Sequence, residues 1–315
     1  MFFELIINQN SKTMKTITIP FIFLMLITNL SIMNAQQTTA VNSETEFADV
    51  SGRKLAYRSI GKGNPIILVN RFRGTLDTWD PLFLDQLAQH YRVITFDYSG
   101  IGYSTGTLPT DLKDVAKDVK DLADFLKIKK TTIMGWSYGG LVTQVATLQY
   151  SDLISQTVLL GTGPPGERVV PLEQAFLDSA LKPVNNFDDE IVLFFEPASE
   201  TSKIEAKASH DRIAKRIDVS KIPSTMEVFQ LYFQGSAGLT EDKDDFKGKL
   251  KTTKTPILII SGDHDISFAA ENWYPLTRQL PTAQLIVLPQ TGHAPHHQHV
   301  DLVVNYIHAF LENTK

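Results

Sequence analysis

The stretch TTIMGWSYGGLVTQVATLQY, from Thr131 to Tyr150, places one serine at the junction of two patterns. An apolar run at its start is typical of a buried strand, and a run with helical spacing of apolar residues begins near Gly139. Ser137 lies between Gly135 and Gly139, so it falls in a tight turn from strand to helix. Glycine leaves room for such a turn, and Gly140 allows the new helix to lie close to the sheet.

The residues from Gly135 to Gly139 have the form G-x-S-x-G, the nucleophile elbow, which holds a serine hydroxyl out at the carboxyl edge of a sheet. Unpaired N–H groups at the start of the helix favour negative charge nearby. A serine hydroxyl becomes a good nucleophile when a histidine takes its proton and a carboxylate orients that histidine. Ser137 is therefore a candidate nucleophile if the chain supplies both groups. Otherwise the motif is a turn with a capping serine.

Short apolar runs recur along the chain and predict strands that are buried on both faces. They are IILV from Ile66, VITF from Val93, TTIM from Thr131, TVLL from Thr157, ILII from Ile257 and LIVL from Leu285. A helix-period segment from Asp111 to Leu126 lies between two of them, and a hairpin is expected from Phe47 onward. Strands that alternate with helices predict an α/β fold, with a mostly parallel sheet covered by helices on both faces.

The alternation stops at about residues 166–250, where the pattern is mainly helical. We call this stretch the cap segment and expect it to lie over the carboxyl edge of the sheet, within a single domain of residues 36–315. Its aromatic residues either line a substrate pocket or pack the cap segment onto the body, and packing is the expected role of any one of them. They are Phe176, Phe187, Phe194, Phe195, Phe229, Tyr232 and Phe233.

A carboxylate and a histidine follow the last two predicted strands, in the order Ser, Asp, His. Asp265 stands in the turn after ILII, and His293 follows Gly292 after LIVL. With Ser137, these motifs resemble the α/β-hydrolase fold superfamily from about Phe47 to the C-terminus. The resemblance implies a catalytic triad of Ser137, Asp265 and His293. It also implies a structural role for Asp97, in the D-x-x-G-x-G-x-S turn DYSGIGYS.

Several neighbours compete for these roles. Asp263 and His264 flank the expected carboxylate, and His296, His297 and His299 follow the expected histidine. The spacing H-x-x-H-H-x-H also suggests a metal site. No carboxylate or cysteine within the run completes a ligand set, and a helix beginning near Pro295 would scatter the side chains, so we expect no metal and no other cofactor.

The loop after the first central strand departs from the His-Gly that is common in the superfamily. Here it reads VNRFRGTLDTWDP, and it resembles a subgroup with the pattern N/Q-R-F-R-G-T-x-D-x-W-D-P. By position, the Phe72 and Tyr138 N–H groups would form the oxyanion hole. Arg71 and Arg73 either bind an acceptor on the substrate or tie the loop to a nearby carboxylate such as Asp77 or Asp80, and the tie is the expected role.

The composition narrows the class of protein. Hydrophobic residues make up 43% and charged residues 21% of the chain, as in ordinary globular proteins. A formal net charge of −5 argues against a nucleic-acid partner, because such binders usually carry a basic face. The absence of cysteine excludes disulfides, thiol nucleophiles and attachment through a lipidated cysteine.

Residues 1–35 have the layout of a secretory signal peptide. Lys15 precedes an apolar run from Ile17 to Ile27, and polar and small residues lead on to Ala35. The run is shorter than the roughly 18 to 20 residues that a membrane-spanning helix needs. We therefore expect cleavage after Ala35, no stable membrane insertion afterwards, and a periplasmic or secreted protein. Met14 is the expected start, because the charge of a signal peptide lies close to its first residue.

Together these patterns predict a serine hydrolase that cleaves a small carboxylic ester, thioester or lactone through an acyl-enzyme intermediate. Two alternatives remain open: a cofactor-free haloperoxidase or perhydrolase with the same triad, and a ligand-binding protein of the same fold that does not turn over its ligand. Serine at position 137 argues against dehalogenase and epoxide hydrolase chemistry, which use a carboxylate nucleophile. Aminopeptidase activity would need an acidic anchor, for which Glu196 is the candidate.

Overall fold

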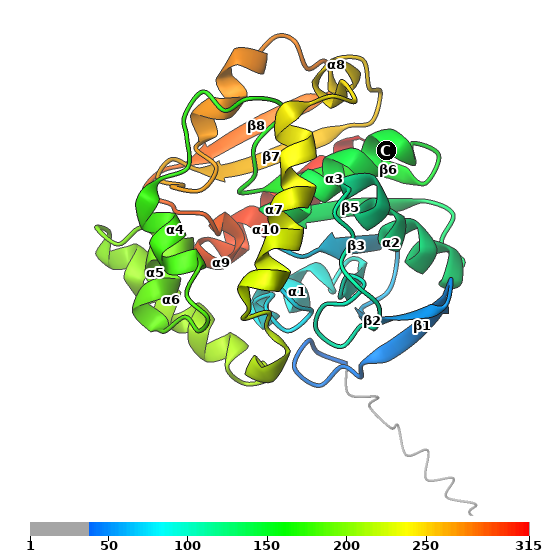
Figure 1. The fold of residues 1–315 in the computed structure, drawn as a ribbon, viewed down its shortest axis with the longest axis horizontal. Helices are drawn as coiled ribbons and strands as arrows, with labels where there is room; N and C mark the ends of the chain where they lie inside the picture. The colour runs from blue at the N-terminus through cyan, green and yellow to red at the C-terminus, as the bar shows by residue number, and fades with distance from the viewer. Residues whose placement is uncertain (1–37, 315) are drawn as a thin grey trace, which may run out of the picture. The chain divides into compact units, whose positions relative to one another are not determined.

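The computed structural model describes residues 38–314. The predicted signal segment, with Met14 and the cleavage site after Ala35, lies outside these residues. An eight-stranded sheet runs through the described part in the order β1-β2-β4-β3-β5-β6-β7-β8 (Figure 1). Its strands are Glu46–Val50 (β1), Arg53–Ile60 (β2), Pro65–Val69 (β3), Arg92–Phe96 (β4), Thr131–Trp136 (β5), Ile154–Leu160 (β6), Ile257–Gly262 (β7) and Ala283–Leu288 (β8).

The strand predictions are confirmed, because each apolar run of the sequence is a strand of this sheet. β3 to β8 run parallel, whereas β1 and β2 form an antiparallel hairpin that joins the sheet through β4. The hairpin turns at Ser51 and Gly52, whose φ angles of 48° and 81° suit a two-residue turn that follows the twist of the strands. The α/β-hydrolase fold predicted from the sequence is therefore observed.

Helices cover both faces of the sheet, which explains why its strands are apolar at consecutive positions. In β3, Ile67 and Val69 belong to a core shared with helices α2 (Leu112–Phe125) and α3 (Tyr138–Gln149). Ile66 and Leu68 face the opposite core, formed with helices α1 (Pro81–Leu87) and α10 (Val300–Asn313). The predicted helix from Asp111 is α2, whose first turn is capped by the Asp111 carboxylate, which accepts a hydrogen bond from the Lys113 N–H.

The cap segment enters between β6 and β7, and its described elements are helical. They are Gln174–Ala180 (α4), Phe187–Phe194 (α5), Glu200–Ile213 (α6), Val219–Lys221 (η1), Met226–Glu241 (α7) and Phe246–Leu250 (α8). α7 contacts α2 and α3, and it crosses in front of the strands in Figure 1. The remaining elements, Ala270–Leu276 (η2) and Pro295–Gln298 (α9), flank the last strand.

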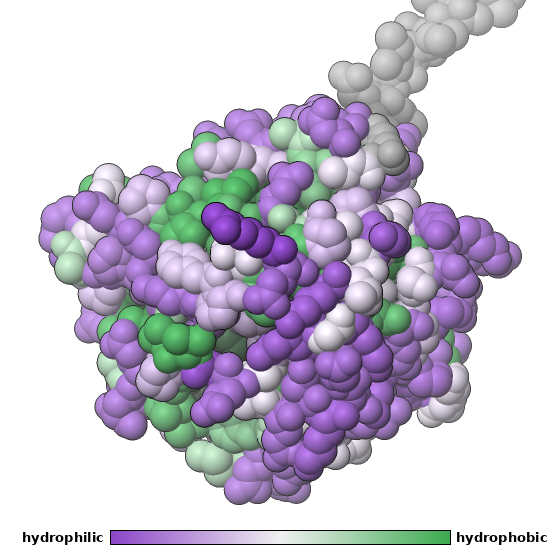
Figure 2. Space-filling model, turned by 90° about the horizontal axis from the view of Figure 1, so that it is seen from above, coloured by the Kyte–Doolittle hydropathy of each residue, from purple (hydrophilic) through white to green (hydrophobic). Residues whose placement is uncertain are grey.

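The surface is mixed in character. Figure 2 shows separate apolar patches among hydrophilic residues on the face seen from above. Within residues 38–314, no helix combines the length and the apolar character needed to cross a membrane.

Candidate active site

Ser137 occupies the turn between β5 and α3 in a conformation that few residues adopt, with φ 58° and ψ −122°. The glycines around it are required by close backbone contacts. A Cβ at Gly135 would lie 2.2 Å from the Gly139 carbonyl oxygen, and one at Gly139 would lie 2.0 Å from the Val69 carbonyl oxygen. The turn therefore needs small neighbours in order to hold Ser137, which is itself buried, at the carboxyl edge of the sheet.

The predicted carboxylate and histidine meet at the same edge. Asp265, beyond β7, accepts a hydrogen bond from the Nδ1 of His293, beyond β8, at 2.8 Å. The other oxygen of Asp265 accepts hydrogen bonds from the N–H groups of Ser267 and Phe268, each at 2.8 Å, which fixes the carboxylate. Both side chains are buried. This arrangement orients the imidazole and leaves its Nε2 for a partner on the other side.

Ser137 and His293 line one small cavity of about 20 Å³, which we call the serine cavity. His293 Nε2 is buried and forms no hydrogen bond with Ser137 or with any other described residue. Contacts of this kind are often long in ligand-free sites and tighten when a substrate binds. The structure thus brings all three predicted residues together, with the Nε2 atom unpaired beside the serine.

The competing residues lie elsewhere. Asp263 contacts the neighbouring His264 at 2.6 Å near the surface, and this hydrogen bond raises the pKa of His264. His299 contacts the Thr291 hydroxyl at 2.9 Å. Neither pair lines the serine cavity.

The two remaining histidines are buried in α9. His296 packs among the rings of Trp79, Phe83 and Trp136, and burial lowers its pKa well below the usual value. His297 Nδ1 contacts the Ser209 hydroxyl at 3.2 Å. The helix does not scatter these two side chains, because their ring centres lie 4.4 Å apart. Residues 38–314 nonetheless contain no group of three His, Asp or Glu residues placed to hold a metal ion.

The oxyanion loop follows β3 and is anchored by Asn70. Its side-chain amide donates to the Phe96 carbonyl oxygen and accepts from the Trp79 indole, both at 2.7 Å. The N–H groups of Phe72 and Tyr138 form no hydrogen bond with other described residues. Both residues line a cavity with Ser137, and Tyr138 is the first residue of α3, where backbone donors lack helical partners. Two unpaired donors are therefore available near the serine.

Arg73 does tie the oxyanion loop, but the expected partners were wrong. Its guanidinium donates to the carbonyl oxygens of Ala180, Lys182, Pro183 and Pro223 and to the side chain of Asn185, at 2.7–3.1 Å. All of these acceptors belong to the cap segment, so Arg73 joins the loop to the cap segment rather than to Asp77 or Asp80. Arg73 itself has a φ of 59°, in the left-handed region that few residues other than glycine adopt.

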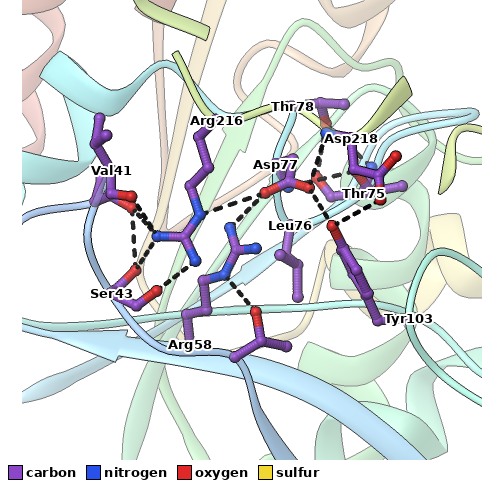
Figure 3. A network of polar contacts seen from close by, with 12 residues as sticks. Val41, Ser43, Arg58, Thr75, Leu76, Asp77, Thr78, Tyr103, Arg216 and Asp218 are labelled. Atoms are coloured by element: carbon purple, nitrogen blue, oxygen red, sulfur yellow. Dashed lines mark hydrogen bonds and ion pairs between the residues drawn. The ribbon is translucent and has the colours of Figure 1, made fainter. Parts of the chain in front are cut away.

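Asp77 and Asp80 instead form ion pairs with other arginines. Asp77 pairs with Arg58 at 2.5 Å and lies 3.6 Å from Arg216, which follows α6 (Figure 3). Asp80 pairs with Arg212 of α6 at 2.7 Å. In Figure 3, Arg216 also reaches the chain near Val41 and Ser43, so this network fastens the cap segment to the body.

Asp97 has the structural surroundings implied by the resemblance. Its carboxylate accepts hydrogen bonds from the Leu76 N–H at 2.7 Å and the Tyr103 N–H at 2.9 Å, and it lies against Gly102. Burial raises the pKa of Asp97 to about 7. The residue joins two loops behind the site and does not line the cavities around Ser137.

Two larger cavities adjoin the serine cavity. The apolar chamber, of about 190 Å³, shares Phe72, Ser137, Phe176 and Ala180 with it. The arginine chamber, of about 400 Å³, shares Arg71, Arg73, Asn185 and Phe194 with it. The serine thus stands beside two spaces of different character.

The aromatic residues of the cap segment divide between lining and packing. Phe176, Tyr232 and Phe233 line the apolar chamber, and Phe194 and Phe195 line the arginine chamber. Phe187 packs on the His210 ring, and Phe229 packs on the Phe72 ring. Several of these residues therefore line cavities, although packing was the expected role of each.

Sequence reasoning missed two charged residues of the chambers. Arg168 lines the apolar chamber and Glu190 lines the arginine chamber, and neither stands in a motif that could have identified it. Glu196, the candidate amine anchor, accepts a hydrogen bond from the nearby Ala198 N–H at 2.7 Å and lies outside the lining of the three cavities.

Comparison with known proteins agrees with the fold. The family model described as alpha/beta hydrolase fold matches residues 64–300. The chain therefore belongs to the α/β-hydrolase fold family. A solved α/β-hydrolase fold protein from Chitinophaga pinensis is similar, with a TM-score of 0.77 and 25% identity, over 87% of this chain and 99% of that one.

Curated relatives span several activities. A proline iminopeptidase from Pestalotiopsis fici is 25% identical over 85% of this chain and 99% of its own length. A putative non-heme chloroperoxidase from Synechocystis is 28% identical over 81% and 94%. A pimeloyl-[acyl-carrier protein] methyl ester esterase from Aliivibrio salmonicida is 24% identical over 82% and 96%. Family membership therefore indicates a hydrolase scaffold and leaves the substrate open.

Proposed function

We propose that this protein is a serine hydrolase that cleaves a carboxylic ester, thioester or lactone through an acyl-enzyme intermediate. The observation that carries the proposal is the position of three side chains at the sheet edge. Asp265 holds the Nδ1 of His293, and the opposite nitrogen is unpaired beside Ser137 in one cavity. An arrangement of this kind suits proton transfer from a serine hydroxyl to a histidine.

In the proposed first step, Ser137 Oγ attacks the substrate carbonyl while His293 Nε2 accepts the hydroxyl proton. The Phe72 and Tyr138 N–H groups would bind the resulting oxyanion. Collapse of the tetrahedral intermediate breaks the bond to the leaving group, which receives the proton from His293. In the second step, water attacks the acyl-serine as His293 takes its proton. Collapse of this second tetrahedral intermediate breaks the bond to Ser137 Oγ, which receives that proton from His293, and the carboxylic acid is released. Asp265 stabilises the imidazolium that forms in both steps.

The test uses Ser137→Ala together with a fluorophosphonate probe. Wild-type protein should bind the probe covalently at Ser137 and hydrolyse short aryl esters, and the variant should lose both properties while keeping its thermal unfolding transition. The matched control is Ser236→Ala, which changes another serine of the apolar chamber and should still be labelled. Retained hydrolysis in Ser137→Ala would overturn the mechanism. Absence of any adduct on wild-type Ser137 would favour the ligand-binding alternative.

A second candidate is perhydrolase or haloperoxidase activity, favoured by the similarity to the putative chloroperoxidase. The same residues would then pass the acyl group to hydrogen peroxide instead of water. Peracid formation from a short ester or acid in the presence of peroxide, compared with hydrolysis of that ester, separates the two activities.

We also propose that the protein is exported, on the basis of the apolar run between Ile17 and Ile27. The proposal is tested by N-terminal sequencing of protein recovered from the periplasm and from the medium. Recovery in the cytoplasm alone, with residues 14–35 retained, would contradict it.

A further inference from the structure

Arg71 is a partly buried cation without an anionic partner among the described residues. Its guanidinium lies between the rings of Trp136 and Phe194, at 5.2 and 4.5 Å from their centres. One nitrogen donates to the Phe72 carbonyl oxygen at 2.7 Å. The buried Nε has no hydrogen-bond partner within the described chain, and no carboxylate there forms an ion pair with Arg71. A buried donor of a charged group is costly when it is left unpaired, which favours a ligand that accepts a hydrogen bond from it.

The surroundings leave Arg71 available to an anion. Burial and the neighbouring Arg73 lower its pKa to about 10, so it is still protonated at neutral pH. Arg73 is occupied by its acceptors in the cap segment. Glu190, the carboxylate of the same chamber, contacts His210 at 2.7 Å. Arg71 therefore keeps unused donors, and its side chain lines both the arginine chamber and the serine cavity.

The two chambers suggest the shape of the substrate. The apolar chamber is lined by Ser137 itself, with Phe72, Phe176 and Tyr232 also in its wall. The arginine chamber is joined to the serine cavity by Arg71, which lines both spaces. We infer that the substrate is a carboxylate-bearing ester whose apolar part occupies the apolar chamber and whose carboxylate binds the Arg71 guanidinium.

This inference rests on the proposed ester hydrolysis and adds a substrate class to it. Arginine suits the role because its planar donors match the two oxygens of a carboxylate. A purely structural role is the competing explanation, since Arg71 also contacts the backbone of the oxyanion loop. The two roles differ in a measurable way, because a structural defect slows anionic and neutral esters alike.

The kinetic test compares pairs of esters that differ by a carboxylate in place of a methyl group. Monobutyl glutarate and butyl pentanoate carry the difference on the acyl side, and 4-butyryloxybenzoate and 4-tolyl butyrate carry it on the leaving group. In at least one pair, wild-type protein should prefer the anionic ester. Arg71→Met should lower the anionic-to-neutral ratio of kcat/KM by about 10- to 100-fold, as expected for a hydrogen-bonded charge pair. Arg71→Lys should give an intermediate loss.

The matched control is Arg168→Met, which removes the arginine of the apolar chamber and should leave the ratio unchanged. The inference is overturned if wild-type protein prefers the neutral ester in both pairs. It is also overturned if Arg71→Met leaves the ratio unchanged, or if Arg168→Met is the variant that abolishes the preference. If Arg71→Met fails to fold, the anionic-to-neutral ratio of kcat/KM in Arg71→Lys tests the inference instead, and an unchanged ratio overturns it.

A binding experiment separates this inference from the proposed function. Ser137→Ala cannot form the acyl-serine, so calorimetry on this variant measures affinity without turnover. In the pair whose anionic ester the wild-type protein prefers, or in at least one pair if it hydrolyses none, this variant should bind the anionic ester at least about tenfold more tightly than the neutral one, and adding Arg71→Lys should reduce that difference. Such binding without hydrolysis by wild-type protein would refute the proposed function and support the role of Arg71. Hydrolysis by the wild-type protein without this difference in affinity would support the proposed function and refute the role of Arg71.

Discussion

Replacement of Arg73 by methionine should loosen the cap segment. Arg73 is 4% exposed. Its guanidinium donates to four carbonyl oxygens of the cap segment and lies 4.7 Å from the centre of the Phe229 ring. Methionine fills similar space and offers no donors. The change therefore tests the hydrogen bonds more than the packing.

The size of the loss in stability depends on which carbonyl acceptors can form a hydrogen bond with water once the arginine is removed. Lys182 and Pro183 are exposed, so water can replace the arginine at their carbonyl groups. Ala180 is buried and Pro223 is partly buried, and each lost hydrogen bond from a charged donor there costs about 1.5 kcal/mol. Loss of the contact with Phe229 adds about 0.5 to 1 kcal/mol. We expect a total loss of about 4 kcal/mol in the free energy of unfolding.

Urea unfolding followed by circular dichroism measures this loss, and hydrogen exchange locates it. Exchange should accelerate in α4, α5 and the segment around Pro223 before it accelerates in the central strands. The conservative control is Arg73→Lys, which keeps the charge and should recover part of the stability. A loss below about 1 kcal/mol, or a selective loss of activity toward anionic esters with unfolding unchanged, would refute the reasoning.

Two further predictions concern His297 and the serine turn. Burial lowers the pKa of His297 to about 4. Between pH 6.5 and pH 4, His297 is therefore protonated in the unfolded chain and neutral in the folded protein. Stability should therefore fall by up to about 3 kcal/mol as the pH drops from 6.5 to 4, and His297→Gln should flatten this slope in urea titrations; equal slopes would contradict the assignment. Gly139→Ala should cost at least about 2 kcal/mol, because its Cβ would meet the Val69 carbonyl oxygen at 2.0 Å. Gly238→Ala, in an exposed and open part of α7, should stabilise slightly, and an equal response of the two variants would argue against the contact.

The sequence was sufficient to predict the strands and the convergence of the candidate triad. Runs such as IILV and ILII are apolar at consecutive positions because helices bury both faces of the strands. Parallel strands bring their carboxyl ends to one edge, so residues that follow β5, β7 and β8 meet there although they are distant in sequence. The alternation of short apolar runs with helical segments is a local pattern that the sequence shows directly, and this alternation predicts a parallel sheet.

Only the tertiary structure decided which groups satisfy the arginines of the oxyanion loop. Asp77 and Asp80 are near Arg73 in sequence, yet they pair with Arg58 and Arg212, while Arg73 reaches carbonyl groups of the cap segment. A backbone carbonyl has no sequence signature, because every residue carries one. The isolation of Arg71 is likewise a property of packing, since it depends on where all the neighbouring carboxylates lie.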